Sequence, residues 1–174
     1  MLKLRCTKTV RGENMIQKTT KLAVLALFIT VNVQAMECPV SMADGPSEQY
    51  VDRVVALYKK QKDCSSVKEI AEACAFGSQV DGVIVGEAVV VCDRFINNNL
   101  KTPILKAKTA KAKAEAKANA AKVLKLYGNT QSLCDSKYAE VEGTIGVSVR
   151  VFCYLDIAYL FSNLTEKSAV GAQD

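Results

Sequence analysis

The chain has 174 residues, of which 49% are hydrophobic and 24% are charged. This composition is typical of one globular domain, so it excludes a disordered tail and a fibrous repeat. The chain contains no histidine, and most familiar hydrolase and metalloenzyme mechanisms are excluded because histidine is the usual general base and the commonest metal ligand.

The first 35 residues are predicted to be a signal peptide that is cleaved after Ala35. Residues 22–33 (LAVLALFITVNV) carry no charge, and two lysines lie just before them. Twelve residues are too few to span a bilayer, which needs about 20 apolar residues. Val33 and Ala35 supply small or modest side chains at the −3 and −1 positions of a cleavage site. Met15 is an alternative start of this signal, and a membrane anchor is the alternative interpretation.

Removal of residues 1–35 changes both the charge and the cysteine count. The whole chain has a net charge of +5, but the remainder has 17 basic and 17 acidic residues, so the basic precursor is no evidence for nucleic-acid binding. An even number of cysteines in a short exported chain predicts three disulfides and a periplasmic or secreted location, with free buried thiols as the alternative. The six cysteines are Cys38, Cys64, Cys74, Cys92, Cys134 and Cys153.

Two short helices are predicted at the start of a single helical domain over residues 47–165. Residues 36–46 contain two prolines and are predicted to be a loop. The first helix opens at Ser47 and carries an apolar stripe. In the second helix, Ser66 has the capping-box spacing to a glutamate, and Gly77 is expected to end the helix.

The middle of the chain predicts two long helices separated by a run of asparagines. Residues 78–98 are rich in β-branched residues, which favours a strand, but the spacing of their apolar positions and their length favour a helix, which we expect. Asn97 to Asn99 are expected to break the chain. A helix rich in alanine and lysine follows over residues 103–127, with Pro103 in its first turn. Its predicted inner face is Leu105, Ala112, Ala116, Ala120, Val123 and Tyr127.

The end of the domain is predicted to consist of two helices joined by a turn. Thr130 is expected to cap a short helix, and residues 142–144 to form a turn. Residues 147–164 are mostly apolar; their first part alternates like a strand, but the whole segment fits a helix better. Residues 166–174 are expected to be a loose tail. The predicted fold is therefore all-α, an irregular disulfide-stapled helical bundle of about five or six helices.

Helix geometry limits how the first four cysteines can pair. Cys64 and Cys74 bracket a predicted helix that rises about 1.5 Å per residue, so they lie more than about 12 Å apart. Bridged Cα atoms lie about 4.4–6.8 Å apart, which excludes this pair. If the second and third helices fold back on each other near Gly77, Cys64 faces Cys92, which gives the first predicted disulfide.

The other two disulfides follow from the remaining cysteines. Cys134 and Cys153 lie at similar distances on either side of the turn near Gly143, so they form the second predicted pair. Cys38 is then left for Cys74. None of the six shows the CxxC spacing of zinc or redox sites, and no histidine is present to complete a mixed site, so no metal or cofactor is predicted.

Lysines between Lys101 and Lys125 form the most conspicuous candidate site. This segment holds eight lysines and one acid, Glu115. It predicts a basic stripe for an anionic partner such as a surface polymer or a lipid; the alternative is a solvated helix face whose lysine stems lie over alanine. Nucleic acid is disfavoured because no aromatic residues interleave for base stacking. The stripe is Lys106, Lys108, Lys111, Lys113, Lys117, Lys122 and Lys125.

Few residues are candidates for catalysis. Carboxylate pairs are conceivable among Glu69, Glu72, Asp81 and Glu87, but their spacing is shared by many surface acids. A cysteine nucleophile would need an activating base, and the cysteines are expected to be paired. The chain is therefore predicted not to be an enzyme and to have no catalytic residue.

The cysteine layout resembles the LprI-type lysozyme-inhibitor domain. Asp63-Cys64 followed by Glu72-Ala73-Cys74 is similar to the opening of that domain, and Cys134, the glycine turn at 142–145 and Cys153 are similar to its second half. The resemblance covers about residues 63–164, and Cys38 and Cys92 are additions to the pattern. It implies a small exported helical protein of bacteria, some members of which inhibit lysozyme.

These observations predict an exported, non-catalytic binding protein of the bacterial envelope, with a lysozyme or another cell-wall hydrolase as its partner. One alternative is an envelope or host-surface interaction protein that binds anionic polymer or lipid through its lysine-rich helix. A second alternative is a periplasmic immunity protein against a delivered toxin. No transmembrane segment is predicted after signal cleavage.

Overall fold

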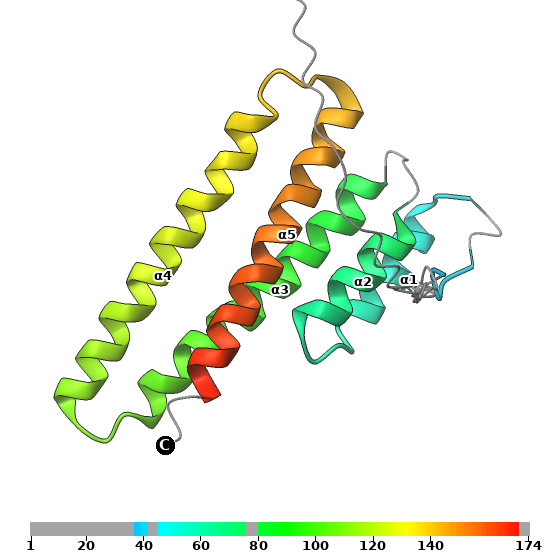
Figure 1. Cartoon of the computed structure of the whole chain (residues 1–174). Helices are drawn as coiled ribbons and strands as arrows, with labels where there is room; N and C mark the ends of the chain where they lie inside the picture. Colours follow the sequence, from blue (N-terminus) through cyan, green and yellow to red (C-terminus); the bar gives the residue numbers. More distant parts are fainter. Residues whose placement is uncertain (1–36, 42–44, 76–79, 171–174) are drawn as a thin grey trace, which may run out of the picture. The chain divides into compact units, whose positions relative to one another are not determined.

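The computed structural model describes residues 37–41, 45–75 and 80–170, and these form five α-helices without a strand (Figure 1). The predicted all-α, disulfide-stapled fold is therefore confirmed. The predicted signal peptide lies outside the described residues and stays a prediction. The helices are α1 (Glu48–Tyr58), α2 (Cys64–Cys74), α3 (Asp81–Lys106), α4 (Ala110–Lys137) and α5 (Gly143–Val170).

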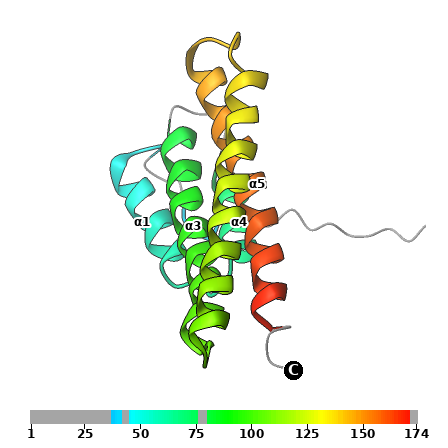
Figure 2. The same ribbon diagram turned by 90° about the vertical axis from the view of Figure 1, so that its left-hand side faces the viewer.

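The core lies where α3 and α5 run side by side in the same direction. Their first turns meet at Gly82 and Val147, and near their ends Asn99 donates hydrogen bonds to the Ser162 carbonyl and to the Thr165 hydroxyl. Helices α1 and α2 cover one side of this pair, and α4 runs antiparallel along another side (Figures 1 and 2). The largest fully buried side chains are Tyr50, Tyr58, Ile84, Ile96 and Leu155.

Short polar residues begin the first two helices. The Ser47 side chain accepts a hydrogen bond from the backbone N–H of Tyr50 and so caps α1. At α2 the Asp63 carboxylate accepts from the N–H of Ser66 at 2.8 Å. The predicted capping box at Ser66 is therefore wrong, because the helix begins two residues earlier and an aspartate satisfies its first free donors. Gly77, expected to end this helix, lies outside the described residues.

Helix α3 confirms the prediction that residues 78–98 favour a helix rather than a strand, within the described residues. It extends further than expected, to Lys106. The asparagines do not break it, since the Asn97 amide donates to the Asp93 carbonyl at 2.8 Å. The Thr102 hydroxyl likewise donates to a carbonyl four residues earlier, so these side chains bond within the helix. Pro103 lies in the last turn of α3, not in the first turn of the next helix. The break comes at residues 107–109, where Thr109 caps α4.

Helix α4 is longer than predicted because neither Gly128 nor Thr130 interrupts it. A glycine inside a helix costs only about 1 kcal/mol relative to alanine. The Thr130 hydroxyl donates to the Leu126 carbonyl instead of capping a new helix. Leu105 is also not on an inner face, because 81% of it is exposed. One continuous helix therefore replaces the two that the sequence predicted.

Helix α5 begins at the predicted turn and extends beyond its predicted end. Gly143 has a φ of +74°, a backbone conformation that favours glycine. The segment that alternates like a strand is helical, because burial of Leu155 and Ala158 against α3 fits a helical period. Residues 166–170 form the last turn of α5, so that part of the predicted loose tail is wrong; residues 171–174 lie outside the described residues.

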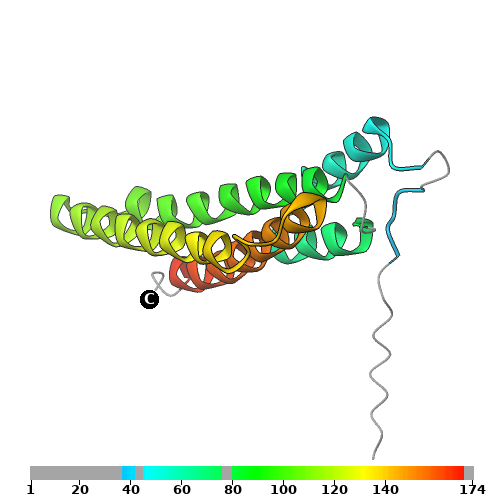
Figure 3. The ribbon, with the colours of Figure 1, turned by 90° about the horizontal axis from the view of Figure 1, so that it is seen from above.

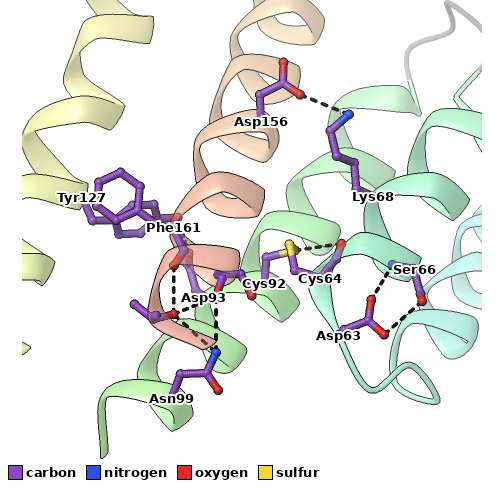
Figure 4. The surroundings of a disulfide bond; sticks show 12 residues. Asp63, Cys64, Ser66, Lys68, Cys92, Asp93, Asn99, Tyr127, Asp156 and Phe161 are labelled. Atoms are coloured by element: carbon purple, nitrogen blue, oxygen red, sulfur yellow. Dashed lines mark hydrogen bonds and ion pairs between the residues drawn. A yellow bond between two sulfur atoms is a disulfide. The ribbon is translucent and has the colours of Figure 1, made fainter. Parts of the chain in front are cut away.

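Three disulfides join the helices, and they match the three predicted pairs. Cys38–Cys74 anchors the segment before α1 to the end of α2, with a Cα–Cα distance of 4.7 Å. Cys64–Cys92 joins α2 to α3 at 5.0 Å (Figure 4). Cys134–Cys153 joins α4 to α5 at 5.9 Å. Such bonds form in an oxidising environment, which supports folding outside the cytoplasm.

Candidate binding surface and groove on helix α4

Helix α4 is the least buried of the long helices. Of its 28 residues, only Tyr127 and Cys134 are buried. It contacts α3 and α5 on one side, and its other sides are exposed (Figures 1 and 3). Alanine and lysine are strong helix formers, so this segment can stay helical with little tertiary support. A large part of its surface is therefore free to meet a partner.

The lysines cover the outer half of α4. Lys106 ends α3 and Lys108 lies in the following turn, while the other five lie on α4 itself; all seven are exposed. At about 100° per residue, Lys113 and Lys122 lie on opposite edges of the face that bears the others. The lysines of the predicted basic stripe therefore form a broad basic surface. We call the five on the helix the α4 lysine face: Lys111, Lys113, Lys117, Lys122 and Lys125.

An apolar groove of about 490 Å³ lies on the inner side of the first half of α4. Ala112, Ala116 and Ala120 line it from α4, and their small side chains leave space that larger residues would fill. The opposite wall is formed by the end of α3, with Leu100 and Pro103, and by the end of α5, with Phe161, Leu164 and Thr165. This volume lies within the range of small-molecule sites.

Several contacts hold the second half of α4 against the core. The rings of Tyr127 and Phe161 lie 5.1 Å apart between their centroids, and the Tyr127 hydroxyl donates to the Asp93 carboxylate on α3 (Figure 4). Burial raises the pKa of Asp93, and the hydrogen bond from Tyr127 offsets part of that rise. Burial and the neighbouring carboxylate likewise raise the pKa of the Tyr127 phenol. Further along α4, the Cys134–Cys153 disulfide and polar contacts of Asp135 join the helix to α5.

Helix α5 exposes apolar side chains beside the groove. Leu164 lines the groove and is 60% exposed, and Leu160 one turn earlier is 57% exposed. Among the described residues, Gly143–Ala169 has the length and mean hydropathy, 1.5, of a membrane-crossing helix, and 22% of its most apolar stretch is buried. Core packing of Leu155 and Ala158 accounts for part of that apolar composition; the exposed leucines add to an apolar surface.

The candidate carboxylates do not gather into one site. Glu72 pairs with Lys68, which also binds Asp156 of α5 at 3.2 Å and so ties α2 to α5 (Figure 4). Burial alone would lower the pKa of Lys68, but its two carboxylate partners raise it overall. Asp81 is buried at the start of α3, while Glu69 and Glu87 are exposed. None of these four candidates lines the groove, and no cluster that could hold a metal exists within the described residues.

No family model matches this chain, and neither a curated protein nor a solved structure matches it. The resemblance to the LprI-type domain therefore stays a prediction.

Sequence reasoning missed the far wall of the groove. Leu100, Phe161 and Leu164 come from helices that are distant in the sequence, and no local pattern connects them. One signal was present: the predicted inner face of the alanine-rich helix consists mostly of small residues. Such a face cannot fill the space between helices as larger side chains do, so it indicates loose packing on that side.

Proposed function

We propose that this chain is an exported, non-catalytic binding protein of the bacterial envelope that holds an anionic partner on the α4 lysine face. The observation that carries the proposal is the charge of an almost unburied helix. Residues 101–125 have eight lysines and one acid. Such a surface attracts anionic polymers and anionic lipid surfaces. Three disulfides support a periplasmic or secreted location.

The rest of the described chain offers no acidic face of comparable strength. Residues 45–75 hold five acidic and five basic side chains, residues 80–100 hold three acidic and one basic, and residues 126–170 hold five acidic and three basic ones. The acidic excess is therefore spread over several helices. A basic hydrolase would meet no concentrated charge there, so the structure favours an anionic partner over a basic one.

Binding to vesicles tests this proposal. Replacing Lys111, Lys113, Lys117 and Lys122 with glutamine is expected to weaken binding to phosphatidylglycerol vesicles and to heparin by about tenfold or more, because each removed charge weakens attraction to an anionic surface by about 1 kcal/mol. Cosedimentation at several salt concentrations measures this, and added salt should weaken binding by the unmodified protein.

The matched control replaces four other exposed lysines with glutamine, which gives the same change in net charge. These are Lys59, Lys60, Lys62 and Lys137. The control should retain most of the binding. Equal loss in both variants, or no binding by the unmodified protein, would overturn the assignment to the α4 lysine face.

A lysis assay separates the hydrolase-inhibitor hypothesis from this proposal. The purified, disulfide-bonded protein is added in excess to lysozymes of several types that act on bacterial cells. Dose-dependent protection that survives the four α4 substitutions would favour inhibition through another surface. Absence of protection would leave anionic binding as the working function.

A further inference from the structure

We propose that the groove beneath α4 binds the hydrocarbon chain of a single-chain anionic amphiphile, of which a long-chain fatty acid is the simplest example. This inference rests on the proposed function, because lysines around α4 also supply the charge that would hold the head group. It adds a second element, an apolar groove for one acyl chain on the inner side of the same helix.

The length of the groove suits one acyl chain. On α4 it extends from Ala112 to Leu126, which at about 1.5 Å per residue is about 20 Å. A bilayer core of about 30 Å holds two chains end to end, so one chain is about 15 Å long. The walls are mostly apolar, and burial of a hydrocarbon chain there is favoured at about 25 cal/mol per Å².

The two ends of the groove differ in a way that orients an amphiphile. At the end near Leu126 the helices close on each other through the Tyr127–Phe161 ring contact, 5.1 Å between centroids. No lysine lines the groove. The opposite end, near Ala112, lies beside the α3–α4 turn, which carries Lys106 and Lys108. The methyl end therefore belongs near Phe161 and the head group near the turn.

Charge at the turn selects an anionic head group over a neutral or cationic one. Four lysines lie within eight residues, and the one carboxylate of the segment, Glu115, lies further along the groove wall. An anion at the turn meets the four lysines before it meets Glu115. These residues, which we call the turn lysines, are Lys106, Lys108, Lys111 and Lys113.

The absence of tryptophan from this chain permits a direct measurement. Leu126 lines the groove and is 59% exposed, so Leu126→Trp places a fluorescent reporter there with little effect on packing. Leu133, 63% exposed and two turns further along α4, lies outside the groove, so Leu133→Trp is the matched control. Brominated palmitate should quench the first reporter and leave the second unchanged.

Filling the groove tests the same site by an independent route. Ala116→Phe with Ala120→Phe places two rings in the groove and should weaken binding of cis-parinaric acid, a fluorescent fatty acid, by about tenfold or more. Ala114→Phe with Ala118→Phe, at exposed positions on the outer side of α4, should change it by less than about twofold. Thermal unfolding of all four reporter and groove variants verifies that each is folded.

Two further comparisons test whether the groove selects an anionic head group, and whether it takes a free amphiphile or a lipid of a bilayer surface. Palmitate should displace cis-parinaric acid better than hexadecanol, and glutamine at the turn lysines should remove that difference. Equal displacement would overturn the anionic selection. Quenching of both reporters, or none, would overturn the groove site itself. Loss of fatty-acid binding in the filled groove with unchanged vesicle binding would support the inference, since a bilayer surface needs only the lysine face.

Failure of this inference is distinguishable from failure of the proposed function. If vesicles bind through the α4 lysine face but cis-parinaric acid does not bind, the groove assignment is wrong and the proposed function stands. If cis-parinaric acid binds in the groove but vesicle and heparin binding ignore the lysine substitutions, the proposed function is wrong and the groove remains a site for free amphiphiles.

Discussion

Helices α4 and α5 have the same length, 28 residues each, but different forces hold them in place. Helix α5 packs along α3 and buries Leu155 and Ala158 completely. Helix α4 buries two residues and depends on Tyr127, one disulfide and the helix propensity of alanine and lysine. A helix that buries few of its residues, and that is stable by its own composition, therefore leaves most of its surface available for binding.

The largest expected change in the free energy of unfolding comes from truncating a buried side chain of α5. Leu155→Ala opens a cavity in a fully buried position, so we expect the free energy of unfolding to fall by about 2–5 kcal/mol. Leu133→Ala on α4, at a position that is 63% exposed, should change it by less than about 0.5 kcal/mol. Chemical denaturation measures both; similar losses would show that α4 is packed as tightly as α5.

Breaking the disulfide between the two helices should have the next largest effect. The Cys134–Cys153 bond closes a segment with a sequence separation of 19, so Cys134→Ser with Cys153→Ser should cost about 3 kcal/mol. Hydrogen exchange should rise first in α4, while α3 keeps its protection, because α4 buries only two of its residues. Uniform loss of protection across both helices would contradict a separate role for this bond.

The smallest expected effect is a pH-dependent change in stability at the Asp93–Tyr127 contact between α3 and α4. Burial raises the pKa of Asp93 above its ordinary value of 3.8, so the folded protein binds this proton more tightly than the unfolded chain does. The stability from this group is present below pH 3.8 and is lost as the pH rises through the folded pKa. Asp93→Asn should therefore gain stability relative to the unmodified protein as pH rises from 3 to 7. Denaturation series across this range would reveal the trend, and a constant difference would refute it.

The helical class followed from local spacing, and the disulfide pairs followed from helix geometry together with the assumption that neighbouring helices fold back on each other. A helix fixes how far apart Cys64 and Cys74 must lie, and that exclusion determined much of the pairing. Helix ends were less predictable. Asn97 and Thr130 can break or cap a helix, but each can also bond within it, and neighbouring helices decide which state is more stable.

In the candidate site, too, one feature could be predicted from the sequence and another could not. The excess of lysine in residues 101–125 is a property of composition, so the sequence by itself determined the charge of α4. The spacing of the lysines on a helix spreads them over a broad face wherever the helix begins. The structure places the start of α4 at Ala110, after a break that the sequence located ten residues too early. The groove depended on α3 and α5, which no local pattern brings together.

The sequence by itself therefore determined the helical class and the sign of the charge on the exposed helix, whereas the disulfide pairing also needed the assumption that neighbouring helices fold back on each other. The class and the charge follow from periodicity, spacing and composition, which act over a few residues or need no folding at all. Only the tertiary structure decided how far each helix extends and which segments face the inner side of α4. The groove and its far wall, with Leu100, Phe161 and Leu164, exist because packing of distant segments competes with local preference and here overrides it.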